Sequence, residues 1–457
     1  MFTSSTSIPS KSEHRSWPTL LLVTPVIGVL SGLGGMSLAL LLHWIQHVAF
    51  GYSLHQVIGH ESFLQGVSAD SVWRRLGVLI ACGAVAGSGW WALYRYGERL
   101  VSIDKALKSP APYMPMLSTL VHAVLQIVTV AMGSPLGREV APREVGAVLA
   151  SWLARRAHLN ADDARIMTAC GAGAGLAAVY NVPLGGALFV LEVLVGTFNC
   201  SVALPALATS SIAAIVASIG LGDTTQYTVP VYAISGSLIG WSIVCGPIIG
   251  LAACAFTRWT SMARTHAARG WHLPLATLLN FAVIGLLAGP FPALLGNGRG
   301  PAQVGFDGEM GVEIAATLLA LKVLITLSTL RSGAMGGLLT PGLSNGALLA
   351  ITLGGAWNHW FTAVPLGSFA IVGAAAFLAT SMRMPLTAIV LLLEFTRVNQ
   401  AFLVPMLLAV AGSGGMAMLV EHFRTTPIHD AAPDVAAPLV YTGIATAPLP
   451  PTSAGSP

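Results

Sequence analysis

The chain has 457 residues, of which 54% are apolar and 9% are charged, whereas about a quarter of the residues of a soluble domain carry a charge. The 22 Lys and Arg and 18 Asp and Glu residues, with a formal net charge of +4, are too few to solvate a globule of this size. These values exclude a soluble enzyme, a nucleic-acid-binding protein and a disordered scaffold. About 20 apolar residues span a bilayer. Longer charge-free runs lie at Trp17–Leu42, Ile166–Leu191, Val193–Gly222, Thr224–Thr257 and Ser332–Met382, so the chain is predicted to be a polytopic membrane protein.

The two ends of the chain differ in character from its apolar centre. Residues 1–17 are polar and are predicted to form a cytoplasmic tail, because the apolar run after them is too long for the core of a signal peptide. Residues 431–457 are rich in Ala and Pro and are expected to form a disordered tail that holds no regulatory domain. Residues 18–430 are therefore predicted to form one transmembrane domain.

The distribution of Lys and Arg predicts the orientation in the membrane. The connection at residues 46–71 has neither residue type, whereas the next connection contains Arg95, Arg99, Lys105 and Lys108. The contrast repeats further along, with none at residues 222–235 and then Arg258, Arg264 and Arg269. Because cytoplasmic connections carry an excess of Lys and Arg, the cationic connections and both termini are predicted to be cytoplasmic.

Glycine and proline interrupt many of the apolar runs. The chain has 50 Gly and 27 Pro, and both residue types disfavour an unbroken helix. Broken helices at membrane depth are tolerated only where they are buried in protein or line a polar cavity. The composition therefore predicts half-helices that enter the membrane around the path of a solute.

Two pairs of segments repeat each other at an offset of about 200 residues. Residues 181–195 read NVPLGGALFVLEVLV and residues 383–397 read RMPLTAIVLLLEFTR, each with a glutamate nine residues after a proline. The turns GREVAP, at Gly137–Pro142, and GGLLTP, at Gly336–Pro341, form the second pair. Interrupted segments at matching positions of two halves indicate the binding site of a transporter. The sequence thus predicts two repeats, at about 18–220 and 236–425.

The two turns are expected to supply an anion-binding site. Each opens a helix, and helix N-termini present unpaired N–H groups with a partial positive charge. In the second turn, the main-chain amides of Gly337, Leu338 and Leu339 stand among almost exclusively apolar side chains. Amides of this kind suit a weakly hydrated, spherical anion that must also leave quickly.

The first turn differs at Glu139, which stands where its counterpart has Leu338. A carboxylate at a helix N-terminus would compete with the permeant anion, and its protonation would release it. Ionisable residues at membrane depth are functional candidates by default. The alternative is that Glu139 caps its own helix or pairs with Arg138 or Arg143. The gate is the favoured interpretation, because the apolar copy of the turn does not require an acid. Arg143 and Glu144 are expected to pair with neighbouring polar groups.

Taken together and in this order, the motifs resemble those of the CLC family of chloride channels and chloride/proton exchangers. The matching segments are GREVAP, GGLLTP, NVPLGGALFVLEV and MPLTAIVLLLEFT, and the resemblance extends from the first span to about His429. It implies an all-α polytopic membrane protein with about 18 helices, including re-entrant half-helices, in two repeats of inverted topology. It also implies a homodimer in the bacterial inner membrane in which each subunit conducts chloride and similar small anions. Glu139 would be the gate, and the amides of Leu338 and Leu339 would hold the central anion.

Three positions depart from the family pattern. The family has a GSGIP turn that supplies a serine hydroxyl to the anion. This turn aligns with Leu100–Asp104, which leaves open whether Val101 or Ser102 faces the anion. His429 takes the place of a tyrosine, as a hydrogen-bond donor to the anion or as a solvated residue at a helix end. In the first turn, Val140 and Ala141 replace Gly-Pro. The candidate anion-binding residues are Val101, Ser102, Gly137, Arg138, Val140, Gly337, Leu338, Leu339 and His429.

Val193 bears on the transport mechanism. Exchangers of the family commonly carry a proton-transfer glutamate at this position, directly after the one matched by Glu192. Glu192 and Glu394 are themselves interpreted as structural acids at helix ends. A passive chloride channel is therefore favoured. The alternatives are a chloride/proton exchanger that uses water or another acid, a fluoride-selective relative, and an intramembrane hydrolase, against which no His, Asp and Ser set lies near the motifs.

No cofactor or metal is expected. The pair His43 and His47 has the spacing of helical metal ligands but lacks the glutamate of a zinc protease. The five cysteines lie in or beside apolar runs without a CxxC pair, so they are interpreted as small hydrophobic residues. Gly337 is expected to adopt a backbone shape that is closed to β-branched residues.

Overall fold

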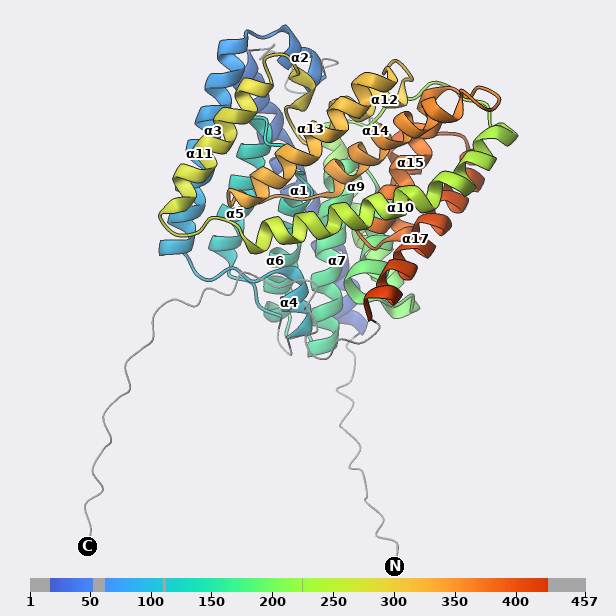
Figure 1. Ribbon diagram of the computed structural model, residues 1–457. Helices are drawn as coiled ribbons and strands as arrows, with labels where there is room; N and C mark the ends of the chain where they lie inside the picture. The colour runs from blue at the N-terminus through green and yellow to red at the C-terminus, as the bar shows by residue number, and fades with distance from the viewer. Residues whose placement is uncertain (1–16, 52–61, 110–111, 224, 426–457) are drawn as a thin grey trace, which may run out of the picture.

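The protein is an assembly of packed helices (Figure 1). The computed structural model describes residues 17–51, 62–109, 112–223 and 225–425. This part of the chain contains 17 α-helices and no β-strand, which confirms the all-α fold class. The predicted C-terminal tail, residues 431–457, lies outside the described residues, as do His429 and residues 1–16 of the predicted N-terminal tail. Trp17, the last residue of that predicted tail, is the first residue of a helix.

The helices of the first half are α1 (Trp17–Phe50), α2 (Phe63–Ala69), α3 (Val72–Tyr96), α4 (Ile103–Lys108), α5 (Met116–Ala131), α6 (Val140–Arg156), α7 (Ala161–Tyr180), α8 (Pro183–Phe189) and α9 (Cys200–Leu221). Those of the second half are α10 (Gly236–Thr265), α11 (His272–Leu287), α12 (Arg299–Phe306), α13 (Val312–Arg331), α14 (Leu339–Trp357), α15 (Leu366–Ser381), α16 (Pro385–Thr396) and α17 (Leu403–Thr425). A π-helical turn at Val190–Val195 continues α8, and two 3₁₀ turns lie at Pro292–Leu294 and Gln400–Phe402.

Only some of these helices are both long and apolar enough to cross a membrane. Within the described residues, six helices are long and apolar enough for this by length and composition: α1, α3, α9, α10, α13 and α17. By contrast, α8 has 7 residues and α16 has 12, well short of the roughly 20 that a span needs. The glycine- and proline-rich segments thus form half-helices, as the sequence predicts.

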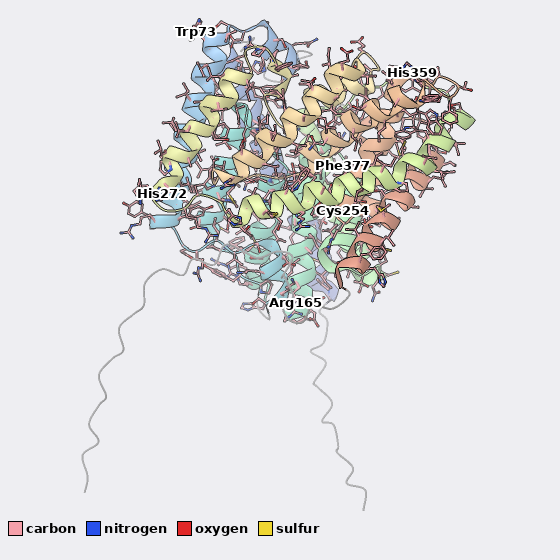
Figure 2. The ribbon with its side chains drawn as sticks, in the orientation of Figure 1. Trp73, Arg165, Cys254, His272, His359 and Phe377 are labelled. Carbon is pink, nitrogen blue, oxygen red and sulfur yellow. The ribbon has the colours of Figure 1, made fainter. Side chains whose placement is uncertain are left out.

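The two repeats have opposite directions. α6 begins at Val140 and runs toward the lower face in Figure 2. That face is marked by Arg165, which lies in the first turns of the next helix, α7. α14 leads from Leu339 toward His359, which follows its end at the upper face. Both helices begin at one place inside the protein, because Gly137 and Gly337, shortly before them, are hydrogen-bonded to each other. The inverted topology therefore brings two helix N-termini together from opposite sides.

Matching glycines let the helix after each turn pack closely against its neighbour. A Cβ atom on Gly146 of α6 would overlap the carbonyl of Gly171 in α7. In the second repeat, a Cβ atom on Gly346 of α14 would lie 2.7 Å from the carbonyl oxygen of Gly373 in α15. Small residues at such crossings allow close backbone approach in membrane proteins. The duplication thus includes the helix packing that fixes the direction of α6 and α14.

The two repeated glutamates join the repeats reciprocally. The carboxylate of Glu394 accepts the backbone N–H groups of Leu184 (3.0 Å) and Gly185 (2.7 Å) at the start of α8. The carboxylate of Glu192 accepts those of Leu386 (2.9 Å) and Thr387 (2.7 Å) at the start of α16, and also the Thr387 hydroxyl. Each acid thus caps the helix of the other repeat, where the first N–H groups would otherwise lack a partner.

Candidate anion-binding site

The candidate site lies where the two glycine-led turns meet. The N–H of Gly137 donates to the carbonyl of Gly337, and the N–H of Gly337 donates to the carbonyl of Gly137, both at 2.8 Å. This is an isolated antiparallel bridge between the repeats. It pairs backbone N–H and carbonyl groups of the two turns and holds the N-termini of α6 and α14 beside each other. The structure therefore brings together the two segments that the sequence pairs.

Glu139 lies at the centre of this junction, with 0% of its surface exposed. Its carboxylate makes no capping hydrogen bond to α6, the helix that it precedes. Instead, Oε1 accepts the backbone N–H of Leu339, the first residue of α14, at 2.6 Å. Oε2 is buried and has no hydrogen-bond partner in the described part of the chain. The acid of the first repeat thus occupies the helix N-terminus of the second, where a negative charge is favoured.

Glycine is required on both sides of this carboxylate for reasons of space. A Cβ atom on Gly137 or on Gly337 would overlap the carboxylate of Glu139. Gly337 is not among the described residues with positive φ, so the expectation of a special backbone shape at this position is wrong. The constraint is instead the side chain of Glu139, which a reading of local sequence could not place there.

The apolar residues of the second turn offer their backbone to the site. Leu338 is the N-cap residue of α14, and the Leu339 side chain is 1% exposed and packs in the main hydrophobic core. Because Leu339 donates its N–H to a carboxylate while its side chain packs elsewhere, binding at this position depends on the main chain. Val140 is the first residue of α6 and supplies the matching helix start.

Arg138 is buried but directed toward other partners. Its guanidinium lies 5.1 Å from the ring centroid of Tyr180 and donates to Oε1 of Gln226 at 3.4 Å. Tyr180, the last residue of α7, shares a 3.1 Å hydrogen bond with the hydroxyl of Thr340, next to Leu339. Tyr180 and Thr340 therefore join the surroundings of the site, and sequence reasoning missed both. The available signal was the position of Tyr180, directly before the NVPLGG motif.

The two candidates from the GSGIP-like segment lie at the start of α4. The hydroxyl of Ser102 accepts the N–H of Lys105 at 3.3 Å and so caps α4, in an exposed position. Val101 is partly buried and packs against the cluster that includes Ala147 and Val148 of α6. The described contacts connect neither residue to the junction at Glu139.

The position of the missing acid, Val193, lies in the π-helical turn after α8 and is 37% exposed. The Arg143 guanidinium lies 4.2 Å from the ring centroid of Phe189, one turn before Val193. The positive charge of Arg143, a residue of α6, therefore lies against α8, the helix that leads to Val193.

Glu144 pairs as expected: its Oε2 lies 2.8 Å from Nδ1 of His122 and 3.0 Å from Nε2 of Gln126, both on α5. Among the described residues, no group of three or more His, Cys, Asp or Glu could hold a metal ion.

Comparison with known proteins identifies the family. A family model described as voltage gated chloride channel matches residues 77–417, most of the chain. The chain belongs to this family, the CLC family. It is therefore an integral membrane protein and a CLC anion transporter. The matched region contains both turns, both repeated helices and the junction at Glu139.

Individual relatives support the same family and fold. The chain is 28% identical to the voltage-gated ClC-type chloride channel ClcB of Citrobacter koseri over an alignment of 404 residues. This alignment covers 82% of this chain and 90% of the relative. Its fold resembles the crystal structure of a slow cyanobacterial Cl⁻/H⁺ antiporter, with a TM-score of 0.71, 19% identity, and coverage of 90% of this chain and 99% of that one. It also resembles a CLC-type fluoride/proton antiporter, with a TM-score of 0.65, 18% identity, and coverage of 88% and 95%.

Proposed function

We propose that this CLC protein is a passive, chloride-selective channel whose gate is Glu139. The observation that carries the proposal is the hydrogen bond from the Leu339 N–H to Oε1 of Glu139. A carboxylate held by a main-chain amide at a helix N-terminus occupies the place that suits a small anion. Protonation removes the negative charge that the amide attracts. The neutral side chain then leaves the amide to a permeant chloride.

Val193 supports the passive mechanism. Proton transport from the cytoplasm needs groups that accept and donate protons within hydrogen-bond reach at each step. The side chain of Val193 does neither, and both oxygens of the neighbouring Glu192 accept hydrogen bonds from α16. The Arg143 guanidinium lies over the ring of Phe189 on α8, and its positive charge also repels a proton that approaches Val193 along α8.

The gate is tested by Glu139→Gln, which keeps the shape and removes the charge. Chloride efflux from liposomes is expected to persist in this variant but to lose most of its dependence on pH. The matched control is Glu309→Gln, because Glu309 is an exposed acid outside the junction. Equal pH dependence in the parent and in Glu139→Gln would refute the gate.

The second candidate is chloride/proton exchange, which the names of the structural relatives favour. The two mechanisms differ in the reversal potential under a pH gradient with symmetric chloride. For a passive channel, this potential is expected to stay near zero, whereas obligatory exchange shifts it by a sizeable fraction of the proton Nernst potential. A reproducible shift that Glu139→Gln abolishes would replace the channel by the exchanger. The same recording with fluoride in place of chloride tests the fluoride-selective alternative.

The proposal extends to the assembly and its location. We place two copies of the chain in the bacterial inner membrane, each with its own anion pathway and with both termini in the cytoplasm. The proposed site offers backbone amides to an anion, and among the described residues around Glu139 we identify no nucleophile with a neighbouring base, which favours transport over an enzymatic activity. Cross-linking of the protein in native membranes measures the number of copies.

A further inference from the structure

A groove opens between α10 and α17 on the surface of the helix assembly. The two helices cross closely at Gly250, where a Cβ atom would lie 2.4 Å from the carbonyl oxygen of Ser413. Beyond this crossing, a groove with a volume of about 380 Å³ follows α10, and Figure 2 labels one of its lining residues, Cys254. The other lining residues are Leu251, Ala255, Arg258, Trp259 and Met262 of α10 and Val420 of α17.

The α10 wall of the groove is an apolar stripe. Its residues recur every three or four positions, which places them on one face of the helix. Leu251, Trp259 and Met262 are each about half exposed, so this face is turned toward the surroundings of the protein. From Leu251 to Met262 the helix rises by about 16 Å, close to half of the roughly 30 Å hydrocarbon core of a bilayer. The stripe therefore has the length and the chemistry to hold an acyl chain.

Arg258 is the charged residue of this stripe. It is exposed and, among the described residues, makes no hydrogen bond, ion pair or ring contact. Glu421 is next to Val420 in the chain, but its carboxylate pairs with Arg383 at 3.6 Å. A charge on a helix surface that faces lipid is costly unless it reaches water or a partner of opposite sign. Arg258 therefore offers its guanidinium to an anion from outside the chain.

The groove lies in the cytoplasmic half of α10 in the orientation proposed above. α10 begins at Gly236, after a connection without Lys or Arg, and Arg258 lies about 10 Å along the axis from its end at Thr265. Trp259 is next to Arg258, and tryptophan is enriched where lipid headgroups meet the hydrocarbon. Both features bring Arg258 near the headgroups of the cytoplasmic leaflet.

We propose that this groove binds an anionic phospholipid of the cytoplasmic leaflet, with its phosphate on Arg258 and one acyl chain along the apolar stripe. A guanidinium donates parallel hydrogen bonds to a phosphate, and basic pockets between transmembrane helices on the cytoplasmic side suit such headgroups. A water-soluble anion would leave the stripe from Leu251 to Ala255 unfilled. The inference uses the proposed orientation of the chain and does not depend on the gating role of Glu139.

The test is thermal unfolding of the full chain in detergent while phosphatidylglycerol, the anionic probe, is added to the micelles. This lipid is expected to raise the unfolding temperature in a saturable way, because a ligand that binds the folded state stabilises it. Phosphatidylcholine carries a phosphate but no net charge, and it is expected to need a higher mole fraction for the same shift. Inorganic phosphate alone is expected to leave the unfolding temperature unchanged.

Variants of Arg258 test the contact with the phosphate. Arg258→Gln is expected to raise the mole fraction of phosphatidylglycerol at the half-maximal shift about fivefold, the effect of one basic residue near a membrane surface. Arg258→Lys keeps the charge and is expected to retain most of the binding. The matched control is Arg269→Gln, which removes one positive charge from an exposed position in the connection after α10 and is expected to bind as the parent does.

A further variant tests the place of the acyl chain. Ala255→Phe fills the groove beside Arg258 and is expected to weaken the binding of both phospholipids. Its control is Val244→Phe, because Val244 is an exposed residue of α10 outside the groove. Because Arg258 is exposed, its variants test the proposal even where Ala255→Phe lowers the stability of the fold.

Several outcomes overturn the proposal. Equal losses in Arg258→Gln and Arg269→Gln would show a diffuse attraction to the basic surface, and the absence of a shift in the parent would show no binding. A shift with inorganic phosphate that Arg258→Gln abolishes would assign Arg258 to a water-soluble anion. Fewer cross-linked copies of Ala255→Phe in membranes would show that a second copy of the chain covers the groove.

Discussion

The two repeats contain the same turn but use it differently. In both, a glycine-led turn opens a helix, α6 or α14, and the two turns bond to each other through Gly137 and Gly337. Only the first carries an acid, and that acid lies on the helix N-terminus of the second. The duplication thus produced a site from two equal helix starts. Glu139, which stands where the second turn has Leu338, makes the first repeat the ligand and the second repeat its receptor.

The pair Glu192 and Glu394 shows the opposite case. Here both repeats keep the acid, and each carboxylate accepts backbone N–H groups from the other repeat. No oxygen of these two acids is among the buried atoms without a partner, whereas Oε2 of Glu139 is. The symmetric acids therefore join the repeats, and the asymmetric acid remains available for an exchange of partners. Symmetry across the repeats thus separates the two acids that cap helices from the acid that we propose as the gate.

The largest expected effect follows from filling the space between the two turns. Gly337→Val places a side chain where the Glu139 carboxylate lies, and overpacking of a dense site costs about 1–3 kcal/mol or more. We expect loss of chloride flux in liposomes. Gly311→Val is the control, because Gly311 has extended backbone and open space around its Cβ position. Wild-type flux in Gly337→Val would show that the two turns are not closely joined.

A second substitution sharpens this result. If overlap with the carboxylate is the cause, Glu139→Ala should relieve it. Gly337→Ala is therefore expected to be harmful alone but tolerated together with Glu139→Ala, as measured by folded yield and flux. Equal damage in both backgrounds would indicate a backbone constraint instead.

An intermediate effect is expected from the symmetric acids. Glu192→Gln and Glu394→Gln each weaken charge-assisted hydrogen bonds, at a cost of about 1.5–3 kcal/mol in free energy of unfolding. Thermal unfolding in detergent should show similar losses for the two variants, while the dependence of flux on pH stays as in the parent. A changed pH profile in either variant would end their assignment as structural acids.

The smallest effect is expected at the edge of the site. Tyr180→Phe removes the 3.1 Å hydrogen bond to the Thr340 hydroxyl, worth about 0.5–1.5 kcal/mol. A small drop in thermal stability should follow, with selectivity for chloride over sodium unchanged. Tyr113→Phe is the control, because its hydroxyl bonds to Glu98 at the surface. Loss of selectivity in Tyr180→Phe would extend the anion site to this hydroxyl.

The amino-acid sequence by itself determined the class of the protein. Few charges and long apolar runs require a bilayer, and the repeated Pro-Leu and Gly-led motifs predict the duplication and the half-helices α8 and α16. It also pointed to Glu139, because the paired turn lacks an acid. These features are local, so spacing and composition are sufficient to find them.

Only the tertiary structure decided which groups meet. The partner of Glu139 is an amide 200 residues away, and the role of Gly337 depends on that side chain and not on its own backbone. The cluster of His122 and Gln126 with Glu144 was equally invisible, although two polar residues one turn apart in the apolar helix α5 were its trace. Contacts of this kind arise when inverted repeats fold onto each other, because buried polar groups must find partners that no local sequence pattern specifies.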